Sequence, residues 1–257
     1  MNQDGPIACV PWFRVVAESP EWIVVSKAAP LIVHPSNGKS EPNLLQGIET
    51  LLCYEVANGM KAALINRLDR ETSGLTLIAK TPTATRQLGR AMQRRQMHKE
   101  YTAIVYGHPA WKQTVCELPI LRQGEVTETR IWLKQCIHPQ GKKCKTEFRV
   151  LRRFTRNGEP FSIIRCIPLT GRTHQIRVHL ATLGSPIVGD KIYGPSEDCY
   201  LEFIHKGWTS ELEARLLLPR HALHACVLDF PFDEELIHTQ DELSPDLEEF
   251  IAGADRE

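Results

Sequence analysis

The feature that most constrains the fold is a succession of short strand-like segments with few helices between them. Apolar runs and apolar/polar alternation of three to nine residues, bounded by polar turns, are typical of β-strands. Such segments lie at 13–16, 22–25, 31–33, 62–65, 75–79, 101–106, 146–151, 161–167 and 222–230. Helical patterns are fewer, at 43–57, from Thr81, at 174–183 and at 247–251. Strands outnumber helices and many are neighbours in sequence. This predicts an α+β fold with a mixed, largely antiparallel sheet flanked by helices and loops.

The helix that starts at Thr81 carries a basic stripe. Thr81 is a suitable N-cap and Pro82 fits the first turn. Arg86, Arg90 and Arg94 then recur at every fourth position, so they lie on one face. Such a stripe could follow the phosphates of a nucleic acid, or it could be an ordinary solvated face. The spacing alone favours neither.

A second helix is predicted over 174–183. Thr173 is the expected N-cap and Gly184 the expected C-cap, and an apolar stripe lies between them. His174 and Arg177, three residues apart, then share a face near the helix start.

Charge is distributed unevenly along the 257 residues, although the net charge is 0. Residues 233–257 hold ten acids and one arginine, which gives −9, so residues 1–232 carry +9. We therefore expect one domain over 1–232, with its core from about residue 12, and an acidic tail over 233–257 that serves solubility. A cationic body fits a polyanionic ligand such as RNA, while a solvated surface explains the same charges.

The composition also limits location and cofactors. No apolar run approaches the roughly 18 residues of a membrane helix, and the first residues lack the order of a secretory signal, so we expect a cytoplasmic protein. The eight cysteines include no Cys-x-x-Cys pair. Neither a zinc site nor a disulfide framework is predicted, and Cys136, His138 and Cys144 are read as ordinary packing or loop residues.

The segment Asn66–Gly74 places one carboxylate, Asp69, between two arginines, Arg67 and Arg70. Apolar runs flank it and Thr72-Ser73-Gly74 is typical of a turn, so Asp69 is expected on a loop between two strands. Guanidinium groups near a carboxylate favour its ionised form and lower its pKa. Such a group suits a nucleophile or an electrostatic stabiliser better than a proton donor.

Together these segments resemble the RluA-like family of pseudouridine synthases, here a compact member. The resemblance rests on five stretches in the family's order and covers roughly residues 12–232. They are Val33-His34-Pro35; Arg67-Leu68-Asp69-Arg70 with Thr72-Ser73-Gly74; Lys99-Glu100-Tyr101; Gly171 to Leu180 with Gly184 to Gly194; and Arg220-His221-Ala222-Leu223-His224-Ala225. A single stretch would be a weak motif match, but five in order are specific.

The resemblance implies isomerisation of a uridine in structured RNA without any metal or other cofactor. The bond between uracil N1 and C1′ breaks, the base rotates, and C5 joins C1′. Asp69 matches the essential aspartate, which either attacks C1′ or removes the 2′ proton to form a glycal. Tyr101 matches a tyrosine that stacks on the uracil, and Arg177 the basic partner of the aspartate.

The resemblance also implies a binding set and an RNA partner. Arg67, Arg70, Arg172 and His174 are the expected substrate-binding residues, while His34, His179 and His224 are expected to pack or support. The target would be a stem-loop of transfer or ribosomal RNA, since a base is extruded most easily where stacking is irregular. We expect a monomer.

Two departures from the family pattern stand out. Asn66 occupies the position where the family usually has histidine, so a supporting contact or the fit to RNA is expected to differ. Many relatives also carry an N-terminal S4 RNA-binding module, and the residues before Trp12 leave no room for one. The catalytic domain is therefore expected to grip RNA by itself.

Two other functions compete with this interpretation. A non-catalytic RNA-binding protein would use the same cationic surface, but it would not require Asp69, Tyr101 and Arg177 together. An N-glycosidase acting on a small nucleoside would need a second catalytic carboxylate or a metal, and the sequence offers neither.

Overall fold

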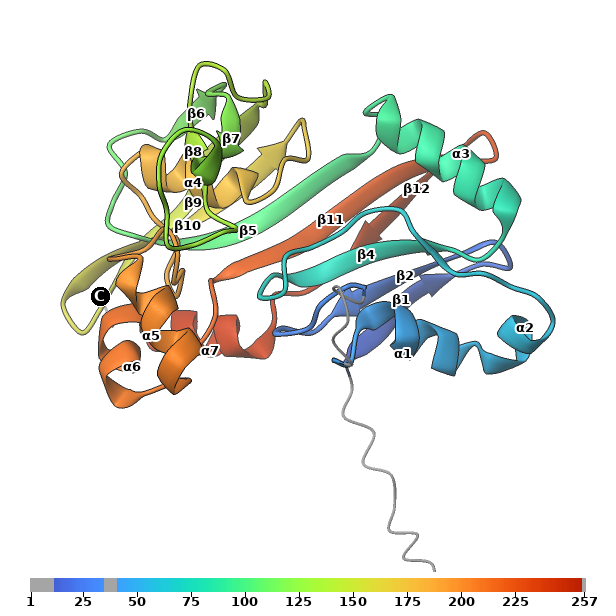
Figure 1. Cartoon of the computed structure of the whole chain (residues 1–257), viewed down its shortest axis with the longest axis horizontal. Coiled ribbons are helices and arrows are strands. Elements are labelled where there is room, and N and C mark those ends of the chain that lie inside the picture. The colour runs from blue at the N-terminus through green and yellow to red at the C-terminus, as the bar shows by residue number, and fades with distance from the viewer. Residues whose placement is uncertain (1–11, 35–40, 256–257) are drawn as a thin grey trace, which may run out of the picture.

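The computed structural model describes residues 12–34 and 41–255. Ten strands form one sheet in the order β1-β2-β4-β11-β5-β10-β9-β6, with β3 paired to β4 and β12 to β11, while β7 and β8 form a separate two-stranded sheet (Figure 1). The strands are β1 (Phe13–Glu18), β2 (Trp22–Lys27), β3 (Ala63–Leu64), β4 (Ser73–Ala79), β5 (His98–Tyr106), β6 (Gln113–Cys116), β7 (Ile120–Arg122), β8 (Gln135–Ile137), β9 (Thr146–Arg156), β10 (Glu159–Pro168), β11 (Leu223–Phe232) and β12 (Glu235–Gln240).

The helices lie around this sheet. Helix α3 covers one face of β4 and β11, and α1 lies beside β2 (Figure 1). Their bounds are α1 (Leu44–Leu51), α2 (Cys53–Ala57), α3 (Pro82–Gln93), α4 (Gln175–Thr182), α5 (Asp198–Lys206), α6 (Ser210–Leu216) and α7 (Pro245–Ala252), with a 3₁₀ turn at Gln123–Glu125. The predicted α+β class and the mixed, largely antiparallel sheet are confirmed.

Strand β2 is covered on both of its faces. Successive side chains of a strand point to opposite sides. Trp22 and Val24 pack with α3, and Ile23 and Val25 pack with α1. The run is apolar throughout because neither face meets water.

One parallel pairing brings distant segments together at the centre of the sheet. The start of β11 pairs with the start of β4 through His224↔Ser73 and Ala225↔Gly74, and the rest of β11 pairs with β12 instead. Gly74 has φ of 105°, and a Cβ there would lie 2.3 Å from the Ala225 carbonyl oxygen. Only glycine permits this close approach, which seats the segment before β4 against β11.

Several local predictions are confirmed and others need correction. The strand expected over 31–33 is reduced to an isolated bridge between Ile32 and Asn43, and Ser73 and Gly74 of the expected turn belong to β4. Thr81 caps α3 through a 3.1 Å hydrogen bond from the Ala84 N–H. The helix expected over 43–57 is divided at Leu52 into α1 and α2. The N-cap of α4 is His174 in a left-handed conformation, not Thr173. The turn expected at Pro35 to Gly38 lies outside the described residues.

The acidic C-terminal segment is built into the domain rather than hanging from it. Strand β12 pairs with β11 over six residues. On α7, Leu247 and Phe250 are buried in the main core, and Phe161 meets Phe250 edge-on at 5.3 Å. The expected boundary at residue 232 therefore falls between two paired strands, because apolar residues among the acids supply core contacts.

Candidate active site

Asp69 lies on the loop between β3 and β4, as expected. The loop closes through a turn in which the Thr72 N–H donates to the Asp69 carbonyl at 3.1 Å. The carbonyl of Arg70 accepts from the Leu31 N–H at 2.9 Å. Backbone contacts thus close the loop and attach it to the segment after β2, and the Asp69 side chain remains 26% exposed.

Arg177 on α4 joins Asp69 to a second carboxylate. Its Nη1 donates to Asp69 Oδ2 at 2.9 Å, while Nε and Nη2 donate to the two oxygens of Asp190 at 2.7 and 2.9 Å. Asp190 is fully buried and also accepts from the backbone N–H groups of Ile192 and Tyr193. The guanidinium is therefore oriented by Asp190 and presents one remaining donor to Asp69.

This environment keeps Asp69 ionised. Burial on its own raises the pKa of the carboxyl, but the charge of His174 in its protonated form, the charge of Arg177 and the Arg177 hydrogen bond hold it below the ordinary value. Burial lowers the pKa of His174 to about 4, so its imidazole is neutral at neutral pH. Arg177 is therefore the lasting positive charge beside Asp69.

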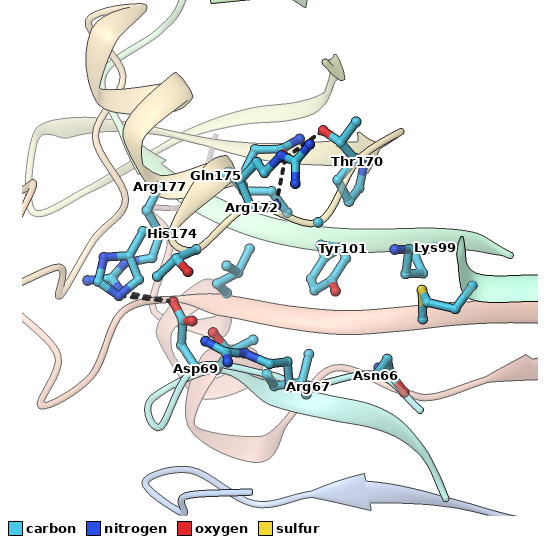
Figure 2. A pocket seen from close by; sticks show the side chains of 18 of the residues that line it. Asn66, Arg67, Asp69, Lys99, Tyr101, Thr170, Arg172, His174, Gln175 and Arg177 are labelled. Atoms are coloured by element: carbon cyan, nitrogen blue, oxygen red, sulfur yellow. Dashed lines mark hydrogen bonds and ion pairs between the residues drawn. The ribbon is translucent and has the colours of Figure 1, made fainter. Parts of the chain in front are cut away.

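A pocket of about 380 Å³ opens above this pair. Figure 2 shows Asp69 and Arg67 on one side, facing Tyr101 on β5 and the residues that lead into α4. Its other charged lining residues are Lys99, Arg172 and Arg177. Among the described residues that line it, Asp69 is the one acid against four basic side chains, three of them arginines, so the pocket suits an anionic ligand.

Tyr101 faces the pocket with a protonated phenol. Burial, followed by the negative charge of Asp69, raises the pKa of its hydroxyl. The ring therefore offers an apolar surface and a neutral hydroxyl rather than a phenolate.

The structure gathers six of the seven predicted site residues around one pocket: Arg67, Asp69, Tyr101, Arg172, His174 and Arg177. Arg70 is not among the lining residues. Its guanidinium lies 3.3 Å from Glu41 and is largely exposed. The low pKa expected for Asp69 is found, but its cause differs, because Arg177 and His174 act where Arg67 and Arg70 were expected.

Two residues to which the sequence analysis assigned no role, Gln175 and Tyr193, fix the segment that leads into α4. Gln175 donates to the Lys145 carbonyl and to Thr146 Oγ1 on β9, and it accepts from Arg172 N–H. Tyr193 Oη lies 2.8 Å from His174 Nδ1 and accepts from the Gln135 N–H on β8. The Gly184 to Gly194 stretch held the signal for Tyr193 and for Asp190, but its spacing does not reveal which partners they contact.

Asn66 attaches the start of the Asp69 loop to strand β4. Its Oδ1 accepts from the Leu77 N–H at 2.7 Å, and its Nδ2 donates to the Leu75 carbonyl at 3.2 Å. The amide thus pairs with β4 as a strand residue would, which requires one donor and one acceptor.

Comparison with known families identifies the family of this chain. A family model described as RNA pseudouridylate synthase matches residues 21–182. The chain belongs to this family. The RNA pseudouridylate synthase match ends before Asp190, so the carboxylate that orients Arg177 lies outside the matched part.

Curated relatives agree with this assignment. "Ribosomal large subunit pseudouridine synthase D" of Nitrosomonas europaea is 35% identical over 216 residues, which is 84% of this chain and 57% of the relative. The protein of the same name from Salmonella typhimurium is 32% identical over 246 residues, 91% of this chain and 72% of the relative. The chain thus spans little more than half of the first relative and nearly three quarters of the second.

Solved pseudouridylate synthase structures share the fold. "Human RNA Pseudouridylate Synthase Domain Containing 1" superposes with a TM-score of 0.70 and 27% identity, covering 94% of this chain and 87% of that one. "Human RNA Pseudouridylate Synthase Domain Containing 4" gives a TM-score of 0.70 at 22% identity, over 93% and 92% of the two chains, and shows the fold alone. No helix in the described part of the chain has the length and apolar character needed to cross a membrane.

Proposed function

We propose that this chain is an active RNA pseudouridine synthase in which Asp69 reacts with the ribose of an extruded uridine. The observation that carries the proposal is the ionised Asp69 carboxylate, held at 2.9 Å by Arg177 in a cationic pocket that Tyr101 also lines. Family membership supplies the reaction class. No cofactor is part of the proposal.

Each residue has a distinct part in the proposed reaction. Asp69 either forms a bond to C1′ as uracil N1 leaves or takes the 2′ proton, and both routes need the anion. Arg177 keeps the carboxylate ionised and aimed. Tyr101 stacks on the uracil ring. Its protonated hydroxyl lies near C5 at the step in which C5 loses its hydrogen.

The pocket's charges support an RNA substrate. Arg67 and Arg172 are exposed on its rim, where they can contact phosphates on either side of the target nucleotide. Extruding a base costs a few kcal/mol and costs least in loops and bulges. Because the named relatives act on the large ribosomal subunit, we propose a stem-loop of large-subunit ribosomal RNA as the substrate, with a transfer RNA stem-loop as the alternative. The same proposal places the protein in the cytoplasm as a monomer.

The arrangement favours an isomerase over a nucleoside hydrolase. A glycosidase uses two carboxylates that flank the scissile bond. Asp190 is bonded to Arg177 and fully buried, and Glu71 faces Lys191 at 2.6 Å. Neither acid is among the pocket-lining residues, so Asp69 acts without a carboxylate partner.

The test is Asp69→Asn with RNA that carries tritium at uridine C5. Bonding C5 to C1′ expels that hydrogen, so the wild type should release tritium and the variant should release none above background. Asp190 still holds Arg177 in the variant, so the fold and RNA affinity should change little. Wild-type release by Asp69→Asn would remove Asp69 from the mechanism.

The choice of RNA separates the competing functions. Wild-type protein is incubated with ribosomal RNA, transfer RNA and free uridine. Release from an RNA fraction supports the synthase, and mapping of pseudouridine then names the site. Binding without release on every fraction would support an RNA-binding protein, and reaction of free uridine alone would support a nucleoside enzyme.

A further inference from the structure

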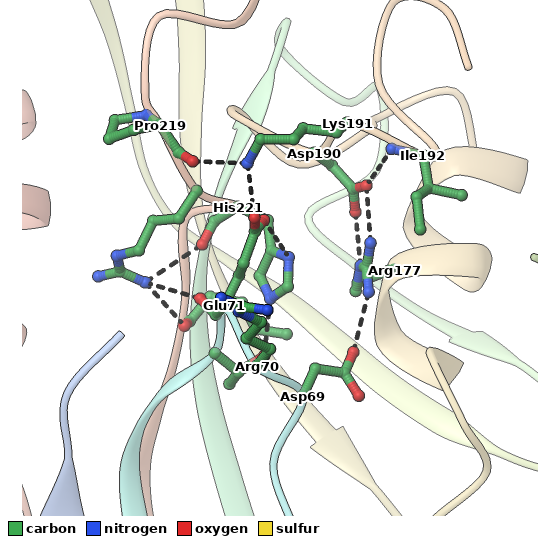
Figure 3. Close-up of polar contacts among 12 residues, drawn as sticks. Asp69, Arg70, Glu71, Arg177, Asp190, Lys191, Ile192, Pro219 and His221 are labelled. Atoms are coloured by element: carbon green, nitrogen blue, oxygen red, sulfur yellow. Dashed lines mark hydrogen bonds and ion pairs between the residues drawn. The ribbon is translucent and has the colours of Figure 1, made fainter. Parts of the chain in front are cut away.

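The loop of Asp69 is attached to one short segment by two ion pairs. Asp69 meets Arg177, which is held by Asp190, and two residues along the loop Glu71 Oε1 meets Lys191 Nζ at 2.6 Å. Asp190 and Lys191 are consecutive residues. Figure 3 shows both connections running in parallel from the loop to the segment 190–191.

The Lys191 side chain is buried among the described residues. Its side chain is 2% exposed, and its ammonium also donates to the Pro219 carbonyl at 2.5 Å. The ammonium lies 4.5 Å from the centre of the Phe203 ring and 5.9 Å from that of Trp208, within the range of a cation–π interaction. A buried ammonium with these contacts is fixed in place, so Glu71 has a rigid partner.

Asp69 itself is held less firmly than its partner. Arg177 keeps two hydrogen bonds to Asp190 whether or not Asp69 is present, but Asp69 has one hydrogen bond to Arg177. The loop's other side-chain attachments lead to different segments. Thr72 and Ser73 bond His221 and His224 through neutral hydroxyl groups, and Glu71 Oε2 lies 3.7 Å from His221 Nδ1. Arg70 pairs with Glu41, and Lys27 and Arg220 donate to the backbone carbonyls of Arg70 and Glu71. The Glu71 pair is the charged attachment to the segment that also holds Arg177.

We propose that Lys191 is a positioning residue that, through Glu71, fixes the loop so that Asp69 meets Arg177. The inference rests on the proposed function for its activity readout, but the geometry of Asp69 can be measured without catalysis. When the pair is removed, the loop shifts, and Asp69 loses its hydrogen bond to Arg177. A misplacement of about 1 Å at a reacting group can lower the rate about a hundredfold.

The charged and titratable groups facing Asp69 define what the measurement reports. They are Arg177 and His174 at the start of α4, His221 before β11, Tyr101 on β5, Tyr193 after Asp190, and Lys27 at the end of β2; Arg67 lines the same pocket. Lys191 is not among them, so its removal acts on Asp69 through position. The pKa of Asp69 should rise as the carboxylate moves away from Arg177.

The experiment compares Lys191→Met, Glu71→Gln and the double variant with the wild type. The pKa of Asp69 is followed by the carboxyl ¹³C shift, assigned with Asp69→Asn, and tritium release gives kcat and KM. All three variants should raise the Asp69 titration midpoint and lower kcat about tenfold to a hundredfold with little change in KM. Lys206→Met, at an exposed pair with Glu202, is the matched control and should behave as wild type.

The double variant separates position from charge. Glu71→Gln with Lys191→Met alters no net charge, so a raised midpoint there reports movement of the loop. A double variant with the wild-type midpoint and rate would overturn the proposal, and so would variants that lose only thermal stability. If Lys191→Met does not fold, Glu71→Gln retains Lys191 and gives the same test. A wild type inactive on every RNA would refute the proposed function, while the titration would still decide the positioning role.

Discussion

Lys27 shows how a single buried amine supports the Asp69 loop through backbone carbonyls. It lies at the end of β2 with no solvent exposure. Its ammonium donates to the carbonyls of Ala28 and Leu31 at 2.9 Å and of Arg70, beside Asp69, at 3.2 Å. Burial, followed by the charge of Arg220, lowers its pKa to about 7. The lysine can therefore donate hydrogen bonds to the loop through its N–H groups, while it carries a positive charge only part of the time at neutral pH.

This pKa makes a prediction about stability and pH. Between about pH 7 and 10.5 the unfolded chain holds a proton on Lys27 that the folded chain has released, so stability from this group rises with pH. The wild type should gain about 3 kcal/mol relative to Lys27→Met between pH 7 and 9.5, since one pKa unit corresponds to about 1.4 kcal/mol. Urea unfolding of both proteins at the two pH values measures the difference. Parallel stability curves would show that Lys27 titrates normally.

At the scale of elements, the C-terminal pair β12 and α7 completes the domain. The acids around these elements act as specific partners: Asp241 lies 2.5 Å from Arg14, and Asp246 receives two hydrogen bonds from Arg220. Arg220 also donates to the carbonyl of Glu71 on the Asp69 loop. Part of the negative charge at this end therefore holds strands and the loop in place rather than serving solubility alone.

The core role of α7 predicts a large effect for Phe250→Ala. Phe250 is 2% exposed, and Arg156 lies 4.3 Å from the centre of its ring. Truncating a buried phenylalanine typically costs about 3–5 kcal/mol. Chemical unfolding should show a loss of that size. Leu236→Ala on β12, where the side chain is 71% exposed, is the control and should change stability by less than about 0.5 kcal/mol. A Phe250 variant as stable as this control would support the original expectation of a tail that serves solubility.

At the scale of the whole molecule, the net charge of zero conceals a cationic surface along α3 beside the pocket. Helix α3 carries Arg86 and Arg90, and Arg94 follows at its end, all in exposed positions, and no acid pairs with them among the described residues. Met92 of the same helix lines the pocket, so the stripe begins beside the site. A long RNA held in the pocket can therefore extend along α3.

This arrangement predicts a change in the salt dependence of RNA binding. Replacing Arg86, Arg90 and Arg94 by Gln should weaken binding to a uridine stem-loop and flatten the plot of log affinity against log salt by about 0.7–0.9 for each phosphate that is no longer neutralised. Filter binding across a salt series measures the slope. Arg215→Gln, at a residue that pairs with Glu202 on α5, is the control and should leave the slope unchanged. An unchanged slope in the α3 variant would identify a merely solvated face.

Local chemistry in the sequence determined much of the fold. Strand alternation and the Thr81-Pro82 helix start each depend on neighbours within a few residues, so they could be predicted without coordinates. The turn expected at Thr72-Ser73-Gly74 lies at 69–72 instead, because Ser73 and Gly74 pair with β11 as the start of β4. Asp69, Tyr101 and Arg177 were also predictable, because their motifs appear in a recognisable order. The left-handed His174 and the break at Leu52 were not, since neither has a distinctive local pattern.

Apart from the Arg177–Asp69 pair, which the family resemblance implied, only the tertiary structure decided which charges meet. Arg177 reaches Asp69 across 108 residues, and Lys191 reaches Glu71 across 120. A sequence shows that Arg67 and Arg70 flank Asp69, but ion pairs act over a few ångströms in space, and Arg70 points to Glu41 instead. The parallel pairing of β4 with β11 and the burial of Asp190 and Lys191 set those distances. The carboxylate and its partner Arg177 could be predicted from the sequence, while the groups that fix them in place, Asp190 and Lys191, were determined by the fold.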